Sequence, residues 1–277
     1  MNDPGNHNRK ILKVGIGSLG TIGVQVAKAL DAGISGLELC AVSARNLEKA
    51  AGNVAGFRHK PDIVPLSELA ELADVVLECA PAAVYDEIAY PAVRRGRIFV
   101  TMTSSALLNR LDLIDEAKET GARLIVPTGG CLGFDAIKAA AEGEIQSVKL
   151  VTRKPPKSLE GAPYLEENRL SLSNLTAPLK VFEGSAREAA RAFPANVNVA
   201  ASLSLAGIGP DRTTVEIWAD PGIDRAIQEL IVRSEAADMD MRIASHPLRE
   251  NPRTGSLTPK SAIATLRALV SNFRVGT

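Results

Sequence analysis

The sequence predicts an α/β protein, in which a Rossmann-like, doubly wound parallel sheet is followed by a second domain of α+β type. Three observations predict it. Strand-like and helix-like apolar patterns alternate from residue 11 to residue 126, and a glycine-punctuated turn separates the first strand from the first helix. Beyond residue 127 the apolar spacing shortens to every second residue, which is typical of half-buried strands.

The first half is expected to form the parallel sheet. The apolar run 11–16 predicts a buried strand, and the residues behind the glycine turn predict a helix that ends near Gly33. The further expected elements are strands at 37–42, 74–78, 97–101 and 123–126 and helices at 47–55, 66–72, 84–94 and 107–120. Because strand–helix–strand units cross over with a right-handed sense, the strands should be parallel with helices on both faces.

The second half is expected to form an antiparallel sheet with helices. Strands are predicted at 145–153 and 213–218 and as a hairpin or meander within 227–243, and helices at 134–141, 185–193 and 197–206. Ser185 followed by Glu188 predicts a capping box at the start of the second of these helices. The predicted division is a tail at 1–10, a dinucleotide-binding domain at 11–126, a substrate and dimerisation domain at 127–260, and a C-terminal helix within 261–277 that could pack on either domain.

Composition and charge narrow the function classes. The 277 residues suffice for two modest domains, and Lys+Arg 32 balance Asp+Glu 32, so a polyanion such as nucleic acid is not an expected partner. No run approaches the roughly 20 apolar residues of a membrane span. The three cysteines, Cys40, Cys79 and Cys131, have neither disulfide nor zinc-site spacing, which favours a reducing cytoplasm and no metal site.

The glycine turn is the strongest chemical signal. Gly15, Gly17 and Gly20 match the dinucleotide fingerprint, in which the first glycine permits the turn, the second leaves room for the pyrophosphate and the third allows close helix packing. The amides at the start of the following helix favour an anion. The sequence therefore predicts that a dinucleotide binds along Gly15, Gly17, Ser18, Leu19, Gly20, Thr21 and Ile22.

Two other strand ends are expected to contact the same dinucleotide. The residues after the second strand include Ser43 and Arg45 and no carboxylate, which favours the 2′-phosphate of NADP and leaves NAD as the other cofactor. Cys79 and Ala80 follow another strand and should lie at the carboxyl edge of the sheet, beside the nicotinamide ribose.

Five dispersed segments resemble one known family: Pro127-Thr128-Gly129-Gly130, Thr152-Arg153-Lys154-Pro155-Pro156, Phe182-Glu183-Gly184-Ser185-Ala186, Phe193-Pro194-Ala195-Asn196-Val197-Asn198-Val199-Ala200 and Asn251-Pro252-Arg253-Thr254. Together, and in this order, they resemble the L-aspartate dehydrogenase family. The resemblance implies a homodimeric NAD(P)-dependent enzyme that interconverts an aspartate-like amino acid and its imino or 2-oxo acid plus ammonia. It also implies that Gly129, Gly130 and Asn198 contact the dinucleotide.

At one position the chain departs from the family it resembles. Family members have an Arg-Asn-x-His segment after an Asp-Pro, and its histidine is the acid/base. Here Asp220-Pro221 is followed by Arg225-Ala226-Ile227-Gln228, so Gln228 stands in the place of the histidine. Glutamine does not exchange a proton near neutral pH. His246, Lys260 and Lys154 are the candidates to replace the histidine, and Gln228 could instead hold a substrate carboxylate or a water.

A dicarboxylate substrate requires fixed positive charges and hydrogen-bond donors. By the resemblance, these are Arg153, Lys154 and Arg253, with Asn198 and Thr254 as further substrate contacts.

Two alternatives stay open at this stage. Cys131 lies in a glycine-rich loop before a helix, where it could be the nucleophile of an acylating semialdehyde dehydrogenase with His246 as its base. Alternatively, a chain without the histidine could be a non-catalytic sensor or regulatory protein that binds NADP(H).

Overall fold

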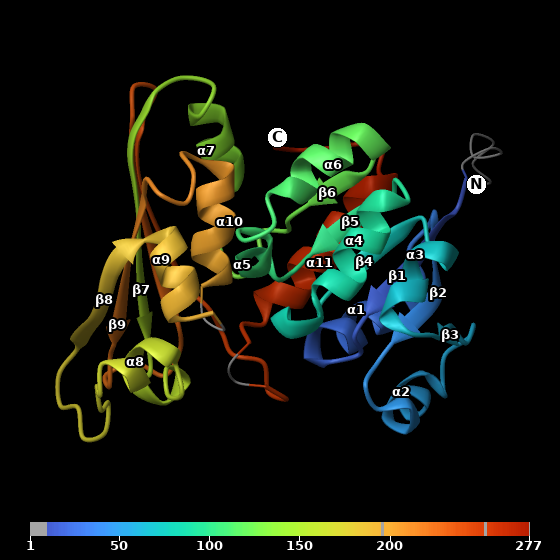
Figure 1. Cartoon of the computed structure of the whole chain (residues 1–277), viewed down its shortest axis with the longest axis horizontal. Coiled ribbons are helices and arrows are strands. Elements are labelled where there is room, and N and C mark those ends of the chain that lie inside the picture. The colour runs from blue at the N-terminus through green and yellow to red at the C-terminus, as the bar shows by residue number, and fades with distance from the viewer. Residues whose placement is uncertain (1–9, 195–196, 252–253, 277) are drawn as a thin grey trace, which may run out of the picture. The chain divides into compact units, whose positions relative to one another are not determined.

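The computed structural model describes residues 10–194, 197–251 and 254–276, which form two compact units (Figure 1). Unit 1 holds the residues up to 103 together with 110–127 and 262–273, and unit 2 holds 104–109, 128–261 and the residues from 274 on. The units differ from the continuous ranges of the predicted division. The segment 104–109 belongs to unit 2, although it lies within the range of the first domain in sequence, and the segment 262–273 belongs to unit 1, although it follows unit 2 in sequence.

Unit 1 contains a six-stranded parallel sheet, which confirms the predicted Rossmann-like fold. Its strands are β1 (Leu12–Gly17), β2 (Leu37–Ser43), β3 (Asp62–Ile63), β4 (Val75–Glu78), β5 (Ile98–Thr101) and β6 (Arg123–Ile125), in the order β3-β2-β1-β4-β5-β6. Successive strands are added toward one edge of the sheet from β1 to β3 and toward the other edge from β4 to β6, so the order of the strands reverses between β1 and β4. Open α/β sheets bind their ligands at the carboxyl ends of the strands beside such a reversal.

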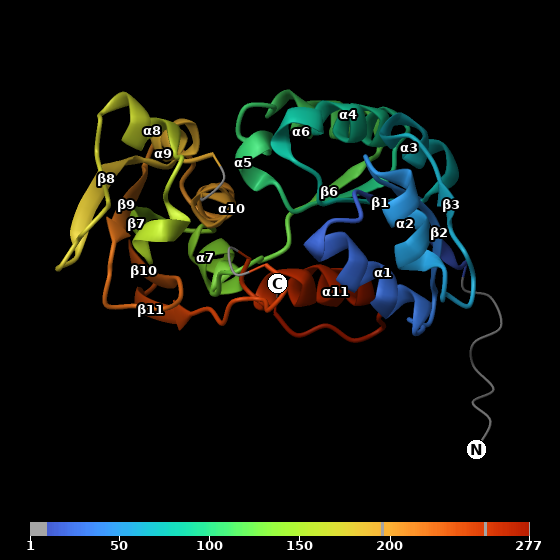
Figure 2. The same ribbon diagram turned by 90° about the horizontal axis from the view of Figure 1, so that it is seen from below.

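Helices cover both faces of this sheet. They are α1 (Thr21–Asp31), α2 (Leu47–Val54), α3 (Leu69–Leu72), α4 (Asp86–Arg94), α6 (Asp112–Thr120) and the second part of α11 (Leu257–Val270), with short 3-10 turns at η1 (Leu66–Glu68) and η2 (Ala82–Val84). In Figures 1 and 2, α1 and α11 lie on one face, and α3, α4 and α6 lie on the other. The core cluster beneath α1 and α11 is aliphatic; α1 buries Val26 and Leu30 against β1 and β2, and α11 adds Leu266.

The predicted helix 107–120 is wrong in its first part. The chain forms a separate short helix, α5 (Ser104–Leu107), and α6 begins only at Asp112. The cause is tertiary, because the side chains of Ser104 and Ser105 are hydrogen-bonded to Asn198 within unit 2. Local helix propensity cannot reveal such a contact.

Unit 2 contains a five-stranded sheet in the order β11-β10-β7-β9-β8. Its strands are β7 (Ile145–Lys154), β8 (Leu179–Ser185), β9 (Thr213–Ala219), β10 (Ile227–Ser234) and β11 (Asp238–Ala244). The predicted antiparallel sheet is in fact mixed, because β7 and β9 are parallel neighbours. The unpredicted β8 lies between them in sequence, and it pairs antiparallel to β9 at the edge of the sheet.

Helices cover one face of the unit 2 sheet. They are α7 (Phe134–Ala140), α9 (Ala186–Ala192) and α10 (Asn198–Ala206), and Figures 1 and 2 both show them on the same side of the strands. The predicted capping box begins α9, where the Ser185 hydroxyl accepts a hydrogen bond from the Glu188 amide and the Glu188 carboxylate accepts one from the Ser185 amide. A short helix, α8 (Pro163–Glu167), was not predicted. The centre of its Tyr164 ring lies 5.4 Å from the centre of the Phe182 ring and 5.5 Å from the centre of the Phe193 ring.

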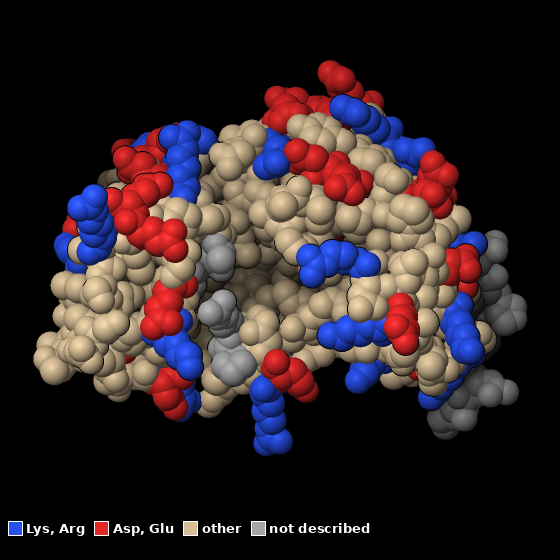
Figure 3. Space-filling view, turned by 60° about the horizontal axis from the view of Figure 1, so that its bottom comes forward, with Lys and Arg blue, Asp and Glu red and all other residues tan. Residues whose placement is uncertain are grey.

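Two surface properties agree with the composition. On the face that Figure 3 shows, Lys and Arg side chains are interspersed with Asp and Glu side chains. Within the described residues, no helix is both long and apolar enough to span a bilayer.

Candidate active site

The turn after β1 contains a residue in the left-handed conformation and leads into the N-terminus of α1. Ser18 has a backbone φ of 95°, a left-handed conformation that non-glycine residues rarely adopt outside functional sites. The amides of Ser18 and Leu19 both donate to the Ser43 carbonyl oxygen at the end of β2, over 3.0 and 3.1 Å. Gly20 is the N-cap of α1, and neither a side-chain cap nor an acidic residue occupies the first turn. The partial positive charge of this helix end is therefore available to a phosphate.

The glycines of this loop differ in role from the sequence prediction. Gly15 lies inside β1 and is not part of the turn; a Cβ there would approach the Ala73 Cβ to 3.1 Å, so its role is packing. Gly17 ends β1 against Ile88, whose Cδ1 would lie 2.8 Å from an added Cβ. These two contacts are with Ala73, which follows α3, and with Ile88 on α4, and they do not require a ligand.

The left-handed turn residue and the close approach between the loop and α1 are found further along the chain. Ser18 occupies the left-handed turn position, and a Cβ on Gly23, inside α1, would lie 2.0 Å from the Ser18 carbonyl oxygen. An added Cβ on Gly20 would meet only the Ser18 Oγ, at 3.6 Å. These contacts outline a candidate fingerprint, Ser18-x-Gly20-x-x-Gly23, three residues later than the spacing of Gly15, Gly17 and Gly20 indicated, and Gly20 borders the open space above the helix end.

Arg45 is exposed beyond the end of β2. Asn46 next to it caps α2 by accepting a hydrogen bond from the Lys49 amide, so the amide side chain is committed to the helix. This leaves the Arg45 guanidinium and the Ser43 hydroxyl as the polar side-chain groups that the sequence predicted for a dinucleotide ribose or its phosphate.

Glu78, at the carboxyl end of β4, is fully buried and ties the two central loops of unit 1 together. Its carboxylate accepts hydrogen bonds from the Ala80 amide, the Thr101 hydroxyl, and both the amide and the hydroxyl of Thr103. Burial raises the pKa of Glu78, and these hydrogen bonds oppose that effect. The loops after β4 and β5 are therefore fixed by one buried carboxylate.

Cys79 connects the same edge to the nucleotide loop. Its thiol donates to the Ser18 carbonyl oxygen over 3.2 Å, and burial raises its pKa. Cys79 thus supports the strained residue of the loop as a neutral thiol.

In unit 2, Asn198 begins α10 and anchors α5. Its side-chain Oδ1 accepts from the amide and the hydroxyl of Ser105, over 3.1 and 2.7 Å, and its carbonyl oxygen accepts from the Ser104 hydroxyl. Because the oxygen is occupied, the side chain presents its amide NH₂ as the group that can donate to a ligand.

The loop before α7 is fixed by α11. Gly129 has a φ of 60°, and its amide donates to the Ser261 hydroxyl over 3.1 Å; this hydroxyl in turn donates to the Thr258 carbonyl oxygen. Gly129 and Gly130 are partly exposed, as a ligand-contacting loop requires.

The helix-covered face of the unit 2 sheet ends in three polar side chains. Thr152 on β7 and Gln228 on β10 are paired residues of the antiparallel ladder, so their side chains lie on the same face, and Lys154 follows two residues after Thr152 on that face. Thr152 is 3% exposed and Gln228 is 5% exposed, yet among the described residues the Thr152 Oγ1 and the Gln228 Oε1 have no hydrogen-bond partner. Burial lowers the pKa of Lys154 to about 8.

The structure separates the predicted substrate cations. Arg153 lies on the opposite face of the sheet from Lys154, with its guanidinium 4.8 Å from the centre of the Trp218 ring. The grouping of Arg153 with Lys154 around one substrate is therefore wrong within this chain. Arg253 lies outside the described residues. Thr254 is partly exposed in a turn, where its amide donates to the Asn251 carbonyl oxygen.

Two of the candidate proton carriers are at the surface. His246 is exposed, with its Nδ1 3.0 Å from the Arg225 guanidinium, and Lys260 is exposed on α11. Neither lies on the face of the sheet that carries Thr152, Lys154 and Gln228.

The nucleophile predicted for the semialdehyde alternative does not fit its role. Cys131 is 3% exposed within the apolar core of unit 2, and burial raises the pKa of its thiol to about 12. A nucleophilic cysteine requires an accessible thiolate, so the position of Cys131 contradicts that reading.

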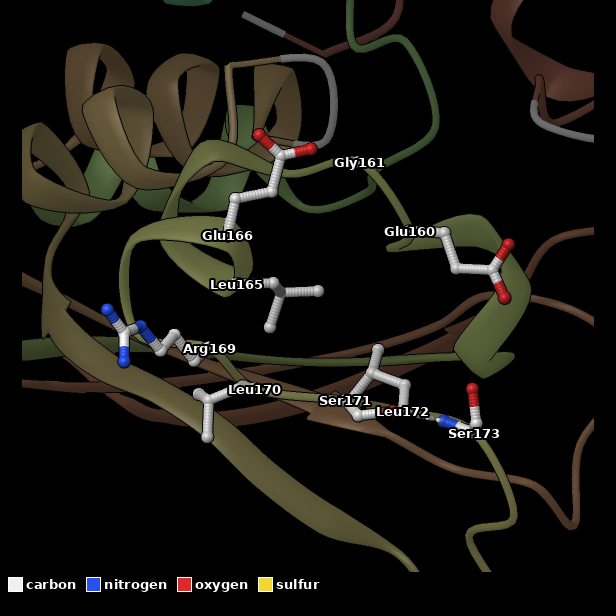
Figure 4. A pocket seen from close by; sticks show the side chains of 9 residues that line it. All are labelled: Glu160, Gly161, Leu165, Glu166, Arg169, Leu170, Ser171, Leu172 and Ser173. Carbon is white, nitrogen blue, oxygen red and sulfur yellow. Dashed lines mark hydrogen bonds between the residues drawn. The ribbon is translucent and has the colours of Figure 1, made fainter.

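A surface pocket of unit 2 lies beside α8, away from these residues in sequence. Its lining includes Glu160, Leu165, Glu166, Arg169 and Ser173, which Figure 4 shows around α8 and the segment after it. None of the predicted site residues lines this pocket.

Comparison with known proteins extends over almost the whole chain. The L-aspartate dehydrogenase of Bradyrhizobium diazoefficiens is 48% identical over 266 residues, which cover 96% of this chain and 94% of that protein. L-aspartate dehydrogenase 3 of Bordetella bronchiseptica is 46% identical over 271 residues, with coverage of 98% and 99%. The crystal structure of aspartate dehydrogenase from Thermotoga maritima superimposes with a TM-score of 0.73 at 25% identity, covering 96% of this chain and 99% of that one.

Two family models match the two halves. Residues 18–127 match the NAD-binding domain of homoserine dehydrogenase, and residues 135–269 match the C-terminal domain of aspartate dehydrogenase. The first match begins at Ser18, the first residue of the fingerprint that the backbone geometry defines.

Proposed function

The chain belongs to the L-aspartate dehydrogenase family, and on that premise we propose that it catalyses the NAD(P)-dependent oxidative deamination of L-aspartate, in either direction. The α-carbon of aspartate loses a hydride, the resulting imine is hydrolysed, and oxaloacetate and ammonia are released. The observation that carries the proposal is the near full-length identity to the two bacterial L-aspartate dehydrogenases.

The residues of unit 1 fit a bound dinucleotide. We propose that the pyrophosphate lies at the uncapped end of α1, over Ser18, Leu19, Gly20, Thr21 and Ile22, where Gly20 leaves open space. When bound, the dinucleotide accepts or supplies the hydride. Cys79, Ala80, Gly129, Gly130 and Asn198 are the further proposed cofactor contacts.

The polar end of the unit 2 sheet fits a substrate amino group. The Thr152 Oγ1 and the Gln228 Oε1 are buried acceptors without a partner among the described residues, and an amino group carries the donors that they lack. We place Gln228, which the family resemblance aligns with a histidine, in this role of holding the substrate.

Enzyme assays test the proposal directly. Purified protein with oxaloacetate, ammonium and NADPH should show loss of NADPH absorbance at 340 nm, and aspartate with NADP⁺ should show its gain. Fluorescence titration with NADPH distinguishes the non-catalytic alternative. NADPH binding without turnover of aspartate, oxaloacetate or any other 2-oxo acid would favour the sensor.

We further propose that NADP is preferred over NAD. Ser43 ends β2 and Arg45 follows it, where the exposed Arg45 can pair with a 2′-phosphate. Arg45→Ala should raise the KM for NADP⁺ about tenfold, the equivalent of one charge-assisted contact of about 1.4 kcal/mol, and leave the KM for NAD⁺ unchanged. Equal changes for both cofactors would contradict the assignment.

The remaining expectations are a homodimer and a cytoplasmic location. The face of the unit 2 sheet opposite α9 and α10 carries Lys149, Arg153 and Trp218, and we propose that a second copy of the chain covers it. Light scattering coupled to gel filtration tests the dimer, and cell fractionation tests the location.

A further inference from the structure

Resting on the proposed function, we propose that Ser105 is a positioning residue, which holds the carboxamide of Asn198 in the orientation that turns its NH₂ group toward the bound dinucleotide. Asn198 is the residue at which α10 begins, and it is one of the proposed cofactor contacts. Ser105 lies on α5, far from Asn198 in sequence but in direct contact with it. Ser105 acts through Asn198 and does not itself touch the dinucleotide.

The hydrogen bonds of Ser105 identify the two ends of the carboxamide. The backbone amide of Ser105 lies 3.1 Å from the Asn198 Oδ1, and the Ser105 hydroxyl lies 2.7 Å from the same atom. A backbone amide can only donate, so the atom that it faces is the carboxamide oxygen. A carboxamide turned by 180° would bring its NH₂ against this donor and lose both hydrogen bonds, which makes the turned form at least about tenfold less populated.

The backbone of Asn198 is held by two further serines. The Ser104 hydroxyl donates to the Asn198 carbonyl oxygen over 2.7 Å, and the Ser202 hydroxyl donates to the Ser104 hydroxyl over 2.9 Å. The residues Ser104, Ser105 and Ser202 are all buried, with exposed fractions of 1%, 5% and 7%. Because water has little access to compete for these hydrogen bonds, the main chain and the side chain of Asn198 are both fixed before a ligand binds.

The network of buried hydroxyls ends in a side chain that a ligand can reach. Asn198 is partly exposed, unlike the serines that hold it. The Ser105 hydroxyl has one proton, and the Asn198 Oδ1 is its nearer acceptor, because the Pro194 carbonyl oxygen lies 3.4 Å away. A donor that is already oriented loses little conformational entropy on binding, so the effect of Ser105 should appear in the affinity for the dinucleotide.

Asn198→Asp separates the two ends of the carboxamide. Aspartate keeps an oxygen for the amide and the hydroxyl of Ser105, but it has no NH₂ group to donate and it adds a negative charge. The thermal midpoint of unfolding should therefore equal or exceed that of the wild type, whereas the Kd for NADPH, measured by fluorescence titration, should rise at least about tenfold. Wild-type NADPH affinity in Asn198→Asp would overturn the proposal.

Ser105→Ala removes the hydroxyl and leaves the backbone amide, so it loosens the carboxamide of Asn198 without deleting it. The Kd for NADPH should rise about three- to tenfold, as expected for one lost hydrogen bond. In an Asn198→Ala background the same substitution should leave the Kd unchanged, because no carboxamide remains to be oriented. An equal rise in both backgrounds would overturn the proposal and make Ser105 a purely structural residue.

Ser204 supplies a matched control on α10. It is fully buried, and its hydroxyl donates to the Ala201 carbonyl oxygen of the same helix over 2.8 Å. Ser204→Ala removes a buried hydroxyl from the same helix without altering the partners of Asn198, so the Kd for NADPH should stay at the wild-type value. If Ser204→Ala weakened NADPH binding as much as Ser105→Ala, a general loss of stability would explain both results and the inference would be wrong.

A spectroscopic readout is independent of turnover. In ¹H–¹⁵N NMR spectra, the side-chain NH₂ signals of Asn198, assigned by their loss in Asn198→Asp, should shift when NADPH is added to the wild type. Signals that stay in place would refute the inference. The proposed function fails separately if the wild type binds NADPH but turns over aspartate with neither dinucleotide, because the Ser105 measurements need only binding. A wild type that binds neither dinucleotide would refute both.

Discussion

Glu78 in unit 1 and the pair Thr152 and Gln228 in unit 2 all stand near the end of a central strand, and all are buried. Their hydrogen bonding differs. Glu78 accepts four hydrogen bonds from the two loops above it, whereas the Thr152 Oγ1 and the Gln228 Oε1 accept none from the described residues. The buried carboxylate of Glu78 is fully paired and holds two loops in place, whereas the two oxygens in unit 2 are acceptors that a substrate with hydrogen-bond donors would satisfy under the proposed function.

Glu78→Ala should have the largest effect on this comparison. The substitution leaves the amides of Ala80 and Thr103 and the hydroxyl of Thr101 without their acceptor, so the free energy of unfolding should fall by about 3–5 kcal/mol. Urea denaturation followed by circular dichroism measures it. Glu71→Ala is the control, because its carboxylate is half exposed in an ion pair with Arg95 and should cost at most about 1 kcal/mol. Equal losses would show that Glu78 does not hold unit 1 together.

Gly23→Ala should have the second-largest effect. It tests the close approach of α1 to the Ser18 carbonyl oxygen, which shapes the loop after β1. Its Cβ would lie 2.0 Å from the Ser18 carbonyl oxygen, and the loop would have to move. We expect a loss of about 1–3 kcal/mol in stability, typical of overpacking, together with weaker NADPH binding. The control is Gly52→Ala in α2, where a Cβ meets nothing within 4 Å and alanine should stabilise the helix slightly. Unchanged NADPH affinity in Gly23→Ala would argue against the fingerprint that begins at Ser18.

These two positions also show how far sequence alone can reach. The strand and helix alternation of unit 1 and the Ser185 capping box are local patterns, and both were predicted correctly. The position of the turn within the glycine-rich segment could not be predicted in the same way. The chain has glycines at 15, 17, 20 and 23, and only the backbone shows that Ser18 adopts the left-handed conformation. The parallel pairing of β7 with β9 and the role of Thr152 depend on contacts between distant segments, which periodicity does not encode.

The pH dependence of stability tests the state of Glu78, with a smaller expected effect. Burial raises its folded-state pKa above the unfolded value near 4.5. The contribution of the protonated carboxyl is therefore fully present below pH 4.5 and is lost as the pH rises through the folded pKa. The wild type should lose stability relative to Glu78→Gln over that range, as measured by urea denaturation from pH 4 to pH 8. A constant difference between the two proteins would show that the pKa of Glu78 is the same in the folded and unfolded states.

The smallest expected effect, a gain in stability, is the sharpest test of the unpaired group in unit 2. Thr152→Val replaces a hydroxyl that has no partner among the described residues by a methyl group of the same shape, so the free energy of unfolding should rise by about 1 kcal/mol. The catalytic efficiency with aspartate should fall about tenfold, because one acceptor for the substrate amino group is lost.

Thr213→Val supplies the contrast within the same sheet. Thr213, on β9, is fully buried as well, but its hydroxyl donates to the Gly209 carbonyl oxygen over 2.8 Å. This substitution should lower the free energy of unfolding by about 1 kcal/mol and leave the kinetics unchanged. Opposite signs of the stability change for two buried threonines in neighbouring strands would mean that unit 2 sacrifices stability at Thr152 to bind its substrate. If both substitutions destabilise the protein equally, the Thr152 hydroxyl has a structural partner and the substrate site lies elsewhere in unit 2.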